Sequence, residues 1–188
     1  MVRNLTGRLK VDVREVLLKH YEEDSDLFRL LWTHSCKVAA KAADCIAKRG
    51  LDVDRDFVYE AAMLHDVGVV LCHAPSIYCY GTLPYICHGT EGRRLLEECG
   101  LPGHALVCER HTGSGLSIDD IVKQQLPLPH RNMLPTSEEE QLICYADKFF
   151  SKSGDPTREK TVEEVRSSLA KFGLESLARF DEMHQRFC

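Results

Sequence analysis

Six residues with the chemistry of metal ligands recur along the middle of the sequence. They are four histidines and two aspartates, namely His34, His65, Asp66, His88, His111 and Asp147. Neutral imidazole and carboxylate oxygen together suit divalent ions such as zinc, manganese and iron. One tetrahedral site needs about four ligands, so a set of this size predicts a centre for two metal ions.

The position of Asp147 supports this interpretation. It falls on the apolar stripe of a predicted helix, between Ile143 and Phe150. A carboxylate buried without a partner costs several kcal/mol, and a metal ion is the strongest cation that could accompany it. A single histidine on such a stripe, for example His34, is by contrast often a core residue bonded to a carbonyl. The metal prediction therefore depends on the whole set.

These residues stand in segments that resemble the HD superfamily of metal-dependent phosphohydrolases. In chain order the segments are THSCKVAAKAA around His34, MLHDVG around His65 and Asp66, CHGTEG around His88, ERHTG around His111 and CYADK around Asp147. They extend over residues 30–150, which is most of the chain. Their order and the HTG segment are most similar to the branch with two metals, which includes bacterial hydrolases of diadenosine tetraphosphate.

The resemblance implies a ligand set for each ion and a reaction. One ion would be held by His34, His65, Asp66 and Asp147, and Asp66 would bridge to a second ion held by His88 and His111. A metal-activated hydroxide would attack phosphorus, with Asp66 and Lys148 as catalytic residues. Iron is the expected metal, and manganese, zinc, cobalt and magnesium are alternatives.

The cations that bind the substrate's phosphate are less well defined by the sequence. Lys148 follows Asp147 and Arg110 precedes His111, so these two are predicted to bind substrate. Many relatives carry a lysine shortly after the His-Asp pair, where this sequence has only Val67, Gly68, Val69 and Val70. This departure argues against transferring the cyclic-dinucleotide phosphodiesterase activity of one branch.

Three functions follow as hypotheses. The first is a phosphohydrolase that cleaves a phosphoester or phosphoanhydride of a nucleotide or a related small phosphate compound. The second is a di-iron oxygenase, because some HD relatives use the same ligands to activate oxygen. The third is a non-catalytic module that binds metal and nucleotide.

Composition fits a cytoplasmic enzyme with a small-molecule partner. The chain has 188 residues, 44% of them hydrophobic and 28% charged. No apolar stretch reaches the roughly 20 residues that a membrane span requires, and the charged N-terminal segment does not resemble a secretory signal. The net charge of −5 argues against a broad nucleic-acid-binding face. Nine cysteines without paired spacing are expected to be free thiols.

The apolar periodicity is helical nearly throughout and predicts an all-α, HD-domain helical bundle. We expect a single domain over residues 1–188, with a core at about 27–150 and C-terminal helices at 157–187 packing on it. Gly50, Gly100 and Gly173 are expected to end or divide helices, and Ser117 and Ser137 to begin them. Predicted helices cover 11–22, 26–50, 54–68, 88–100, 102–111, 117–123 and 137–150, with an irregular loop at 69–87 and an extended crossing at 126–135.

Overall fold

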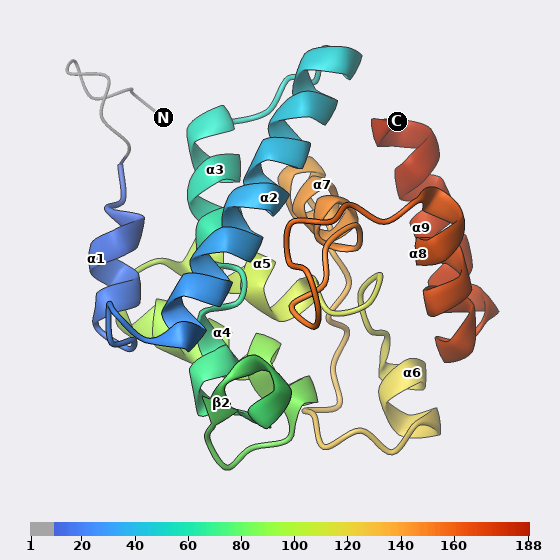
Figure 1. Ribbon diagram of the computed structural model, residues 1–188. Coiled ribbons are helices and arrows are strands. Elements are labelled where there is room, and N and C mark those ends of the chain that lie inside the picture. The colour runs from blue at the N-terminus through green and yellow to red at the C-terminus, as the bar shows by residue number, and fades with distance from the viewer. Residues whose placement is uncertain (1–9) are drawn as a thin grey trace.

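The helical periodicity of the sequence becomes an all-α arrangement in the computed structural model, which describes residues 10–188 (Figure 1). The α-helices in this range are α1 (Val13–Leu18), α2 (Asp26–Arg49), α3 (Arg55–Leu64), α4 (His88–Glu98), α5 (Pro102–Arg110), α6 (Ile118–Lys123), α7 (Glu138–Asp147), α8 (Val162–Leu169) and α9 (Leu174–Phe187). Short 3-10 helices are η1 (Val67–Leu71), η2 (Pro75–Ile77), η3 (Tyr85–Cys87) and η4 (Ala170–Phe172). The fold class predicted from the sequence is confirmed.

The long helix α2 forms the central element of the bundle, and its ends follow the sequence signals. The Ser25 hydroxyl accepts a hydrogen bond from the Phe28 amide at the first turn, and Gly50 ends the helix in the left-handed conformation with φ 63°. Its buried face carries Leu31, His34 and Val38. One side chain of this apolar face is therefore a histidine.

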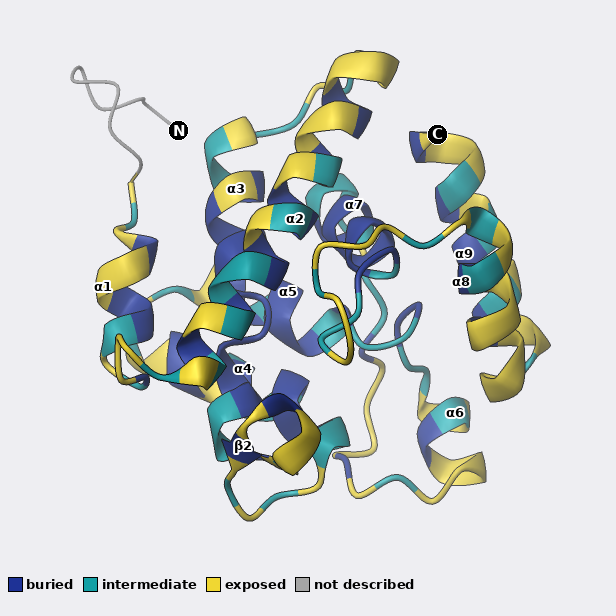
Figure 2. Cartoon of the chain, in the orientation of Figure 1, coloured by how far each residue is buried: buried dark blue, intermediate teal, exposed yellow. Residues whose placement is uncertain are grey.

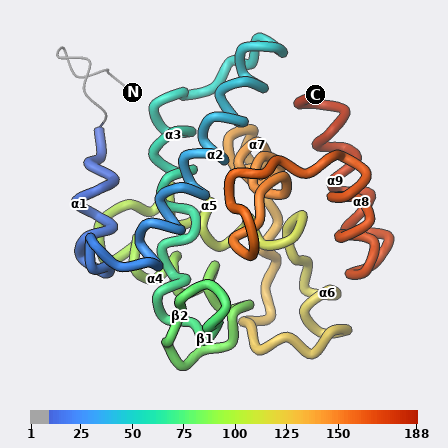
Figure 3. Tube along the Cα trace, viewed as in Figure 1, coloured from blue at the N-terminus to red at the C-terminus, as the bar shows by residue number. Residues whose placement is uncertain are grey.

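Helix α7 lies in the interior, where it packs against α2, α3, α5 and α9. Helices α3 and α7 contact α2, α4 packs on α5 and η1, and α9 packs on α7 (Figure 3). Much of α7 is dark blue in Figure 2, because its residues from Leu142 to Asp147 are buried. One core cluster extends from Val13 on α1 to Phe187 on α9. Within residues 10–188, every helix is too short or too polar to span a membrane.

Several predicted boundaries differ from the structure. Helix α1 ends at Leu18 rather than near Glu22, because the chain turns and the Tyr21 hydroxyl donates to the Val67 carbonyl at 2.8 Å. The predicted loop at 69–87 contains two short antiparallel strands, β1 (His73–Ala74) and β2 (Cys79–Tyr80). Helix α7 has Ser137 as its N-cap. The Glu140 carboxylate in its first turn accepts a hydrogen bond from the backbone amide of Thr136, the residue before the cap. The division of the tail at Gly173 is as predicted.

The predicted helix over 54–68 is wrong at its C-terminal end. Helix α3 stops at Leu64, His65 is its C-cap, and Asp66 begins the 3-10 helix η1 with φ −108° and ψ 12°. His65 and Asp66 therefore do not share a helical turn. They lie where the backbone leaves one helix and enters the next, so both side chains turn toward the interior.

Two glycines allow the elements around this turn to approach closely. A Cβ on Gly68 would lie 2.2 Å from the His88 carbonyl oxygen and 2.3 Å from the Gly92 amide. A Cβ on Gly92 would lie 2.1 Å from the Cys108 sulfur. Helices η1, α4 and α5 can thus be packed backbone to backbone only because these positions carry no side chain.

We therefore expect Gly68→Ala to destabilise the protein by about 1–3 kcal/mol or more, the usual cost of overpacking, because the obstructing atoms are backbone. Chemical denaturation would measure the free energy of unfolding. The control is Gly103→Ala in α5, where the nearest atom is the Phe57 ring at 3.3 Å. Equal stability of the two variants would contradict a close-packing role for Gly68.

Candidate metal centre

All six sequence-predicted ligands converge in the interior. Their donor atoms form two groups, His34 with His65, Asp66 and Asp147, and Asp66 with His88 and His111. Within each group the atoms lie within 4.8 Å of one another. They come from α2, the α3–η1 turn, α4, the end of α5 and the end of α7, so the centre joins most of the core helices.

The spacing in the first group is that of ligands around one ion. His34 Nε2 lies 3.0 Å from Asp147 Oδ1 and 3.3 Å from Asp66 Oδ2. His65 Nε2 lies 2.9 Å from the same Asp66 oxygen. With metal–ligand distances of about 2.1 Å, neighbouring ligands lie about 3.0 Å apart in an octahedron and about 3.4 Å apart in a tetrahedron. The donor set therefore fits a divalent ion.

The second group uses the other oxygen of Asp66. Its Oδ1 lies 3.4 Å from His111 Nε2 and 3.6 Å from His88 Nε2, and the two imidazole nitrogens are 3.1 Å apart. Asp66 thus directs one oxygen toward each group. This is the arrangement expected of a bridging carboxylate.

Three of the four imidazoles are oriented by the same local contact. Each is the C-cap of a helix, and its Nδ1 donates to the carbonyl three residues earlier: His65 to Ala62 at 2.6 Å, His88 to Tyr85 at 2.7 Å and His111 to Cys108 at 2.7 Å. A ring nitrogen facing a carbonyl must carry the proton, so Nε2 of each ring is left as the metal-binding atom. Tyr85 also stacks on the His88 ring, with centroids 4.8 Å apart.

Buried polar atoms without normal hydrogen bonds lie at the same point. Both carboxylate oxygens of Asp66 and Nε2 of His65 are buried, and their close charged neighbours do not form hydrogen bonds of normal geometry with them. Buried polar atoms are rarely left in this state, and a cation between them would satisfy all three. The residues present therefore fit a bound divalent metal.

Most of the candidate ligands are in the protonation state that metal binding requires. Burial opposes ionisation, yet His65 and Lys152 hold the pKa of Asp66 well below its usual range, and Lys148 and His34 do the same for Asp147. Burial, reinforced by His111, lowers the pKa of His88 to about 3. The carboxylates are therefore charged and His88 is neutral at neutral pH.

The His111 and His65 rings differ from each other. Burial also lowers the pKa of His111, which favours its neutral, ligating form. For His65 burial acts in the same direction, but the Asp66 and Asp147 carboxylates outweigh it and raise the pKa of His65 to about 9. A metal ion entering the first group must therefore displace a proton from His65.

Lys152 is a residue of this centre that the sequence analysis missed. Its Nζ lies 2.6 Å from Asp66 Oδ2, and its side chain is only 13% exposed. It follows Asp147 by five positions, in the loop after α7. The sequence signal that could have identified it is the second lysine after Asp147, in the run Asp147-Lys148-Phe149-Phe150-Ser151-Lys152. This ammonium brings to Asp66 a positive charge that the segment after the His-Asp pair lacks.

The two predicted substrate cations occupy different environments. The Lys148 ammonium lies 2.8 Å from Asp147 Oδ2 and donates to the His111 carbonyl at 3.0 Å. The Arg110 guanidinium instead contacts both carboxylate oxygens of Glu140, at 2.9 and 3.0 Å, and the Thr136 hydroxyl. Arg110 is not among the residues that line the cavity beside the centre, and its role in substrate binding stays a prediction.

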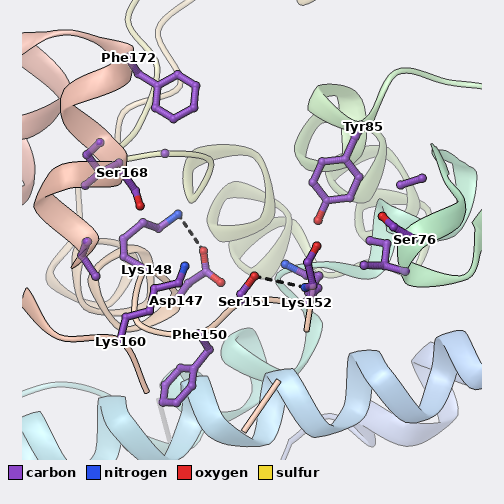
Figure 4. A pocket seen from close by; sticks show the side chains of 16 residues that line it. Ser76, Tyr85, Asp147, Lys148, Phe150, Ser151, Lys152, Lys160, Ser168 and Phe172 are labelled. Carbon is purple, nitrogen blue, oxygen red and sulfur yellow. Dashed lines mark hydrogen bonds and ion pairs between the residues drawn. The ribbon is translucent and has the colours of Figure 1, made fainter. Parts of the chain in front are cut away.

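This cavity, with a volume of about 410 Å³, lies next to Asp147 (Figure 4). Its polar lining includes the ammonium groups of Lys148, Lys152 and Lys160 and the hydroxyl of Tyr85. Ile77, Phe150 and Phe172 contribute apolar surface. A cavity of this size and charge can hold a small anionic molecule against the candidate metal centre.

Comparisons with known proteins agree with this geometry. A family model described as HD domain matches residues 31–151. An uncharacterized protein of Methanocaldococcus jannaschii is 32% identical over 112 residues, which cover 59% of each chain. The tRNA (cytidine(56)-2'-O)-methyltransferases of Picrophilus torridus and Thermoplasma volcanium are 29% and 28% identical over 72% and 79% of this chain. The chain spans only 35% and 39% of these two enzymes.

A solved structure shares the fold. The HD domain of the L. monocytogenes phosphodiesterase PgpH, in complex with cyclic-di-AMP, superposes with a TM-score of 0.51 at 15% sequence identity. The match covers 92% of this chain and 93% of that domain. At this identity the likeness establishes the helical architecture alone.

The shared position of Asp66 leads to a test by mutation. We expect Asp66→Ala to remove metal from both groups, because it supplies an oxygen to each, whereas His88→Ala should chiefly empty the second. Elemental analysis of the purified proteins would count the ions. His130→Ala, at an exposed histidine, is the control. Unchanged metal content in Asp66→Ala would contradict the bridging role.

Proposed function

The chain belongs to the HD-domain family, and from this premise we propose that it is a metal-dependent phosphohydrolase acting on a nucleotide or another small phosphate compound. The observation that carries the proposal is the position of Asp66. Its two oxygens face separate donor groups, and a lysine-lined cavity lies beside them. Two metal ions held by these groups, next to a cationic cavity, would form an arrangement that can catalyse phosphoryl transfer to water.

We propose two divalent ions at this centre, with iron as the first candidate and manganese, zinc, cobalt or magnesium as alternatives. His34, His65, Asp66 and Asp147 would hold one, and Asp66, His88 and His111 the other. Four imidazoles and two carboxylates suit these transition metals better than magnesium, which prefers oxygen ligands. Bound ions supply Lewis acidity that polarises a phosphoryl group and lowers the pKa of water.

Lys148 and Lys152 would hold the phosphate of the substrate. Each ammonium already contacts a carboxylate of the centre, Asp147 and Asp66 respectively, and each lines the cavity. From these positions they can donate to phosphoryl oxygens and offset charge that develops as the bond to the leaving group breaks. Burial raises the pKa of Tyr85, so its hydroxyl keeps its proton and can donate to the same phosphate.

The charge of the cavity favours this function over an oxygenase. Three lysine side chains around one small cavity attract an anion, whereas oxygen activation has no need of them. The phosphodiesterase domain with the similar fold holds cyclic-di-AMP, and this supports a phosphate compound as the ligand here. Membership of the branch that includes diadenosine tetraphosphate hydrolases stays a prediction from the sequence.

Hydrolysis should incorporate oxygen from the solvent. We expect the protein, supplied in turn with iron, manganese, cobalt or zinc, to cleave members of a panel of nucleotides and phosphate esters without molecular oxygen. In labelled water, mass spectrometry should find one solvent oxygen in the released phosphate or phosphomonoester. If no compound is cleaved anaerobically but one is consumed in air, the oxygenase hypothesis replaces this proposal.

The two lysines at the centre give a test of substrate binding. We expect Lys148→Ala and Lys152→Ala each to lower kcat/KM by a factor that corresponds to about 1–3 kcal/mol, because a charge-assisted contact to phosphate is lost. Metal content should stay near that of the parent. Arg110→Ala, assayed alongside, tests the remaining sequence prediction. Parental kinetics in both lysine variants would show that these ammonium groups do not bind substrate.

A further inference from the structure

Lys160 is the lysine of the cavity whose ammonium has no partner among residues 10–188. It lies just before α8 and lines the cavity next to Lys148 and Lys152 (Figure 4). The side chain is half-buried, and its backbone amide donates to the Phe149 carbonyl at 2.8 Å. In the part of the chain that the structure describes, its ammonium forms neither an ion pair nor a hydrogen bond, whereas Lys148 and Lys152 each contact a carboxylate.

The carboxylates nearest to Lys160 in the sequence are engaged elsewhere. Glu159 lies 2.6 Å from the Lys41 ammonium. Glu164 contacts the Arg158 guanidinium at 2.6 Å and accepts from the Thr161 amide at 2.8 Å. The local charges that could have neutralised Lys160 are therefore bound to other groups. Its ammonium is left facing the cavity.

Burial and the other ammonium groups of the cavity disfavour the charged form of Lys160. Burial lowers the pKa of Lys160 and Lys148 and Lys152 act in the same direction, whereas the Asp147 carboxylate and, more weakly, Glu164 raise it. Like charges gathered in a partly buried cavity repel one another. An anion bound between them would relieve that repulsion.

We propose that Lys160 binds a second anionic group of the substrate, next to the phosphate that is cleaved, and that the substrate therefore carries two neighbouring phosphoryl groups. This inference rests on the proposed phosphohydrolase function. The phosphate to be cleaved lies at the centre, where Lys148 and Lys152 accompany Asp147 and Asp66. Lys160 stands on the α8 side of the same cavity and is available to the second group. The apolar wall formed by Val165, Leu169 and Phe172 can contact the organic remainder.

A pair of non-hydrolysable ligands tests this assignment in the metal-loaded protein. Methylphosphonate offers one phosphoryl group and methylenediphosphonate offers two, so the ratio of their dissociation constants reports on the second group. Isothermal titration calorimetry should find the diphosphonate bound more tightly by the parent. In Lys160→Gln this preference should fall by about tenfold, the value of one charge-assisted contact, while methylphosphonate binds as in the parent.

Two further variants control for charge and for folding. Lys160→Arg keeps the charge and should retain most of the preference, and Lys171→Gln removes an exposed charge that does not line the cavity and should change nothing. Thermal unfolding and metal content check that each variant is intact. An unchanged preference in Lys160→Gln, an equal loss for both ligands, or no preference in the parent would overturn the proposal.

The same measurements separate this inference from the proposed function. If the parent prefers the diphosphonate through Lys160 but cleaves no phosphate compound, the anion site stands and the hydrolase proposal falls. If it cleaves phosphate compounds while Lys160→Gln binds both ligands as the parent does, only the anion site falls.

Discussion

The buried carboxylate of Asp66 is the constraint on which the rest of the structure depends. It is wholly inaccessible to solvent, and four imidazole nitrogens and the Lys152 ammonium lie within 3.6 Å of its oxygens. An isolated carboxylate in such a place would cost several kcal/mol. The fold therefore has to bring compensating groups from α2, α4, α5 and the loop after α7 to one point. This requirement explains why polar side chains occupy the middle of an otherwise apolar core.

The backbone meets this requirement by using helix ends. His65, His88 and His111 are each the C-cap of a helical segment, and each donates from Nδ1 to the carbonyl three residues earlier. This one contact fixes the tautomer and directs Nε2 to the centre. Because three such ends must meet, the elements that carry them have to approach more closely than ordinary side chains permit. The glycines at positions 68 and 92 make that approach possible.

The six candidate ligands that meet at this point could be identified from the sequence more readily than the groups around them. The six metal-binding candidates could be found because imidazole and carboxylate on apolar stripes are unusual, and their order along the chain carries the family resemblance. The end of α3 could not be placed, since the turn at His65 and Asp66 depends on contacts of η1 with Tyr21 and α4, which are distant in sequence. Lys152 and Lys160 escaped notice for a similar reason. A lysine in a loop is usually solvated, and only the packing of the segment after α7 brings these two to the cavity.

Two of the three lysines proposed to bind substrate lie outside the part of the chain that carries the candidate metal ligands. The six candidate ligands all lie within residues 31–151, the segment that matches the HD family, whereas Lys152 and Lys160 lie just beyond it. Lys152 contacts Asp66 in this fold, where the position after the His-Asp pair has no cation. Substitutions after residue 151 can therefore alter the charge of the cavity without removing a candidate metal ligand. Under the proposed function, the class of phosphate compound that the protein selects would then change while the candidate metal centre stays the same.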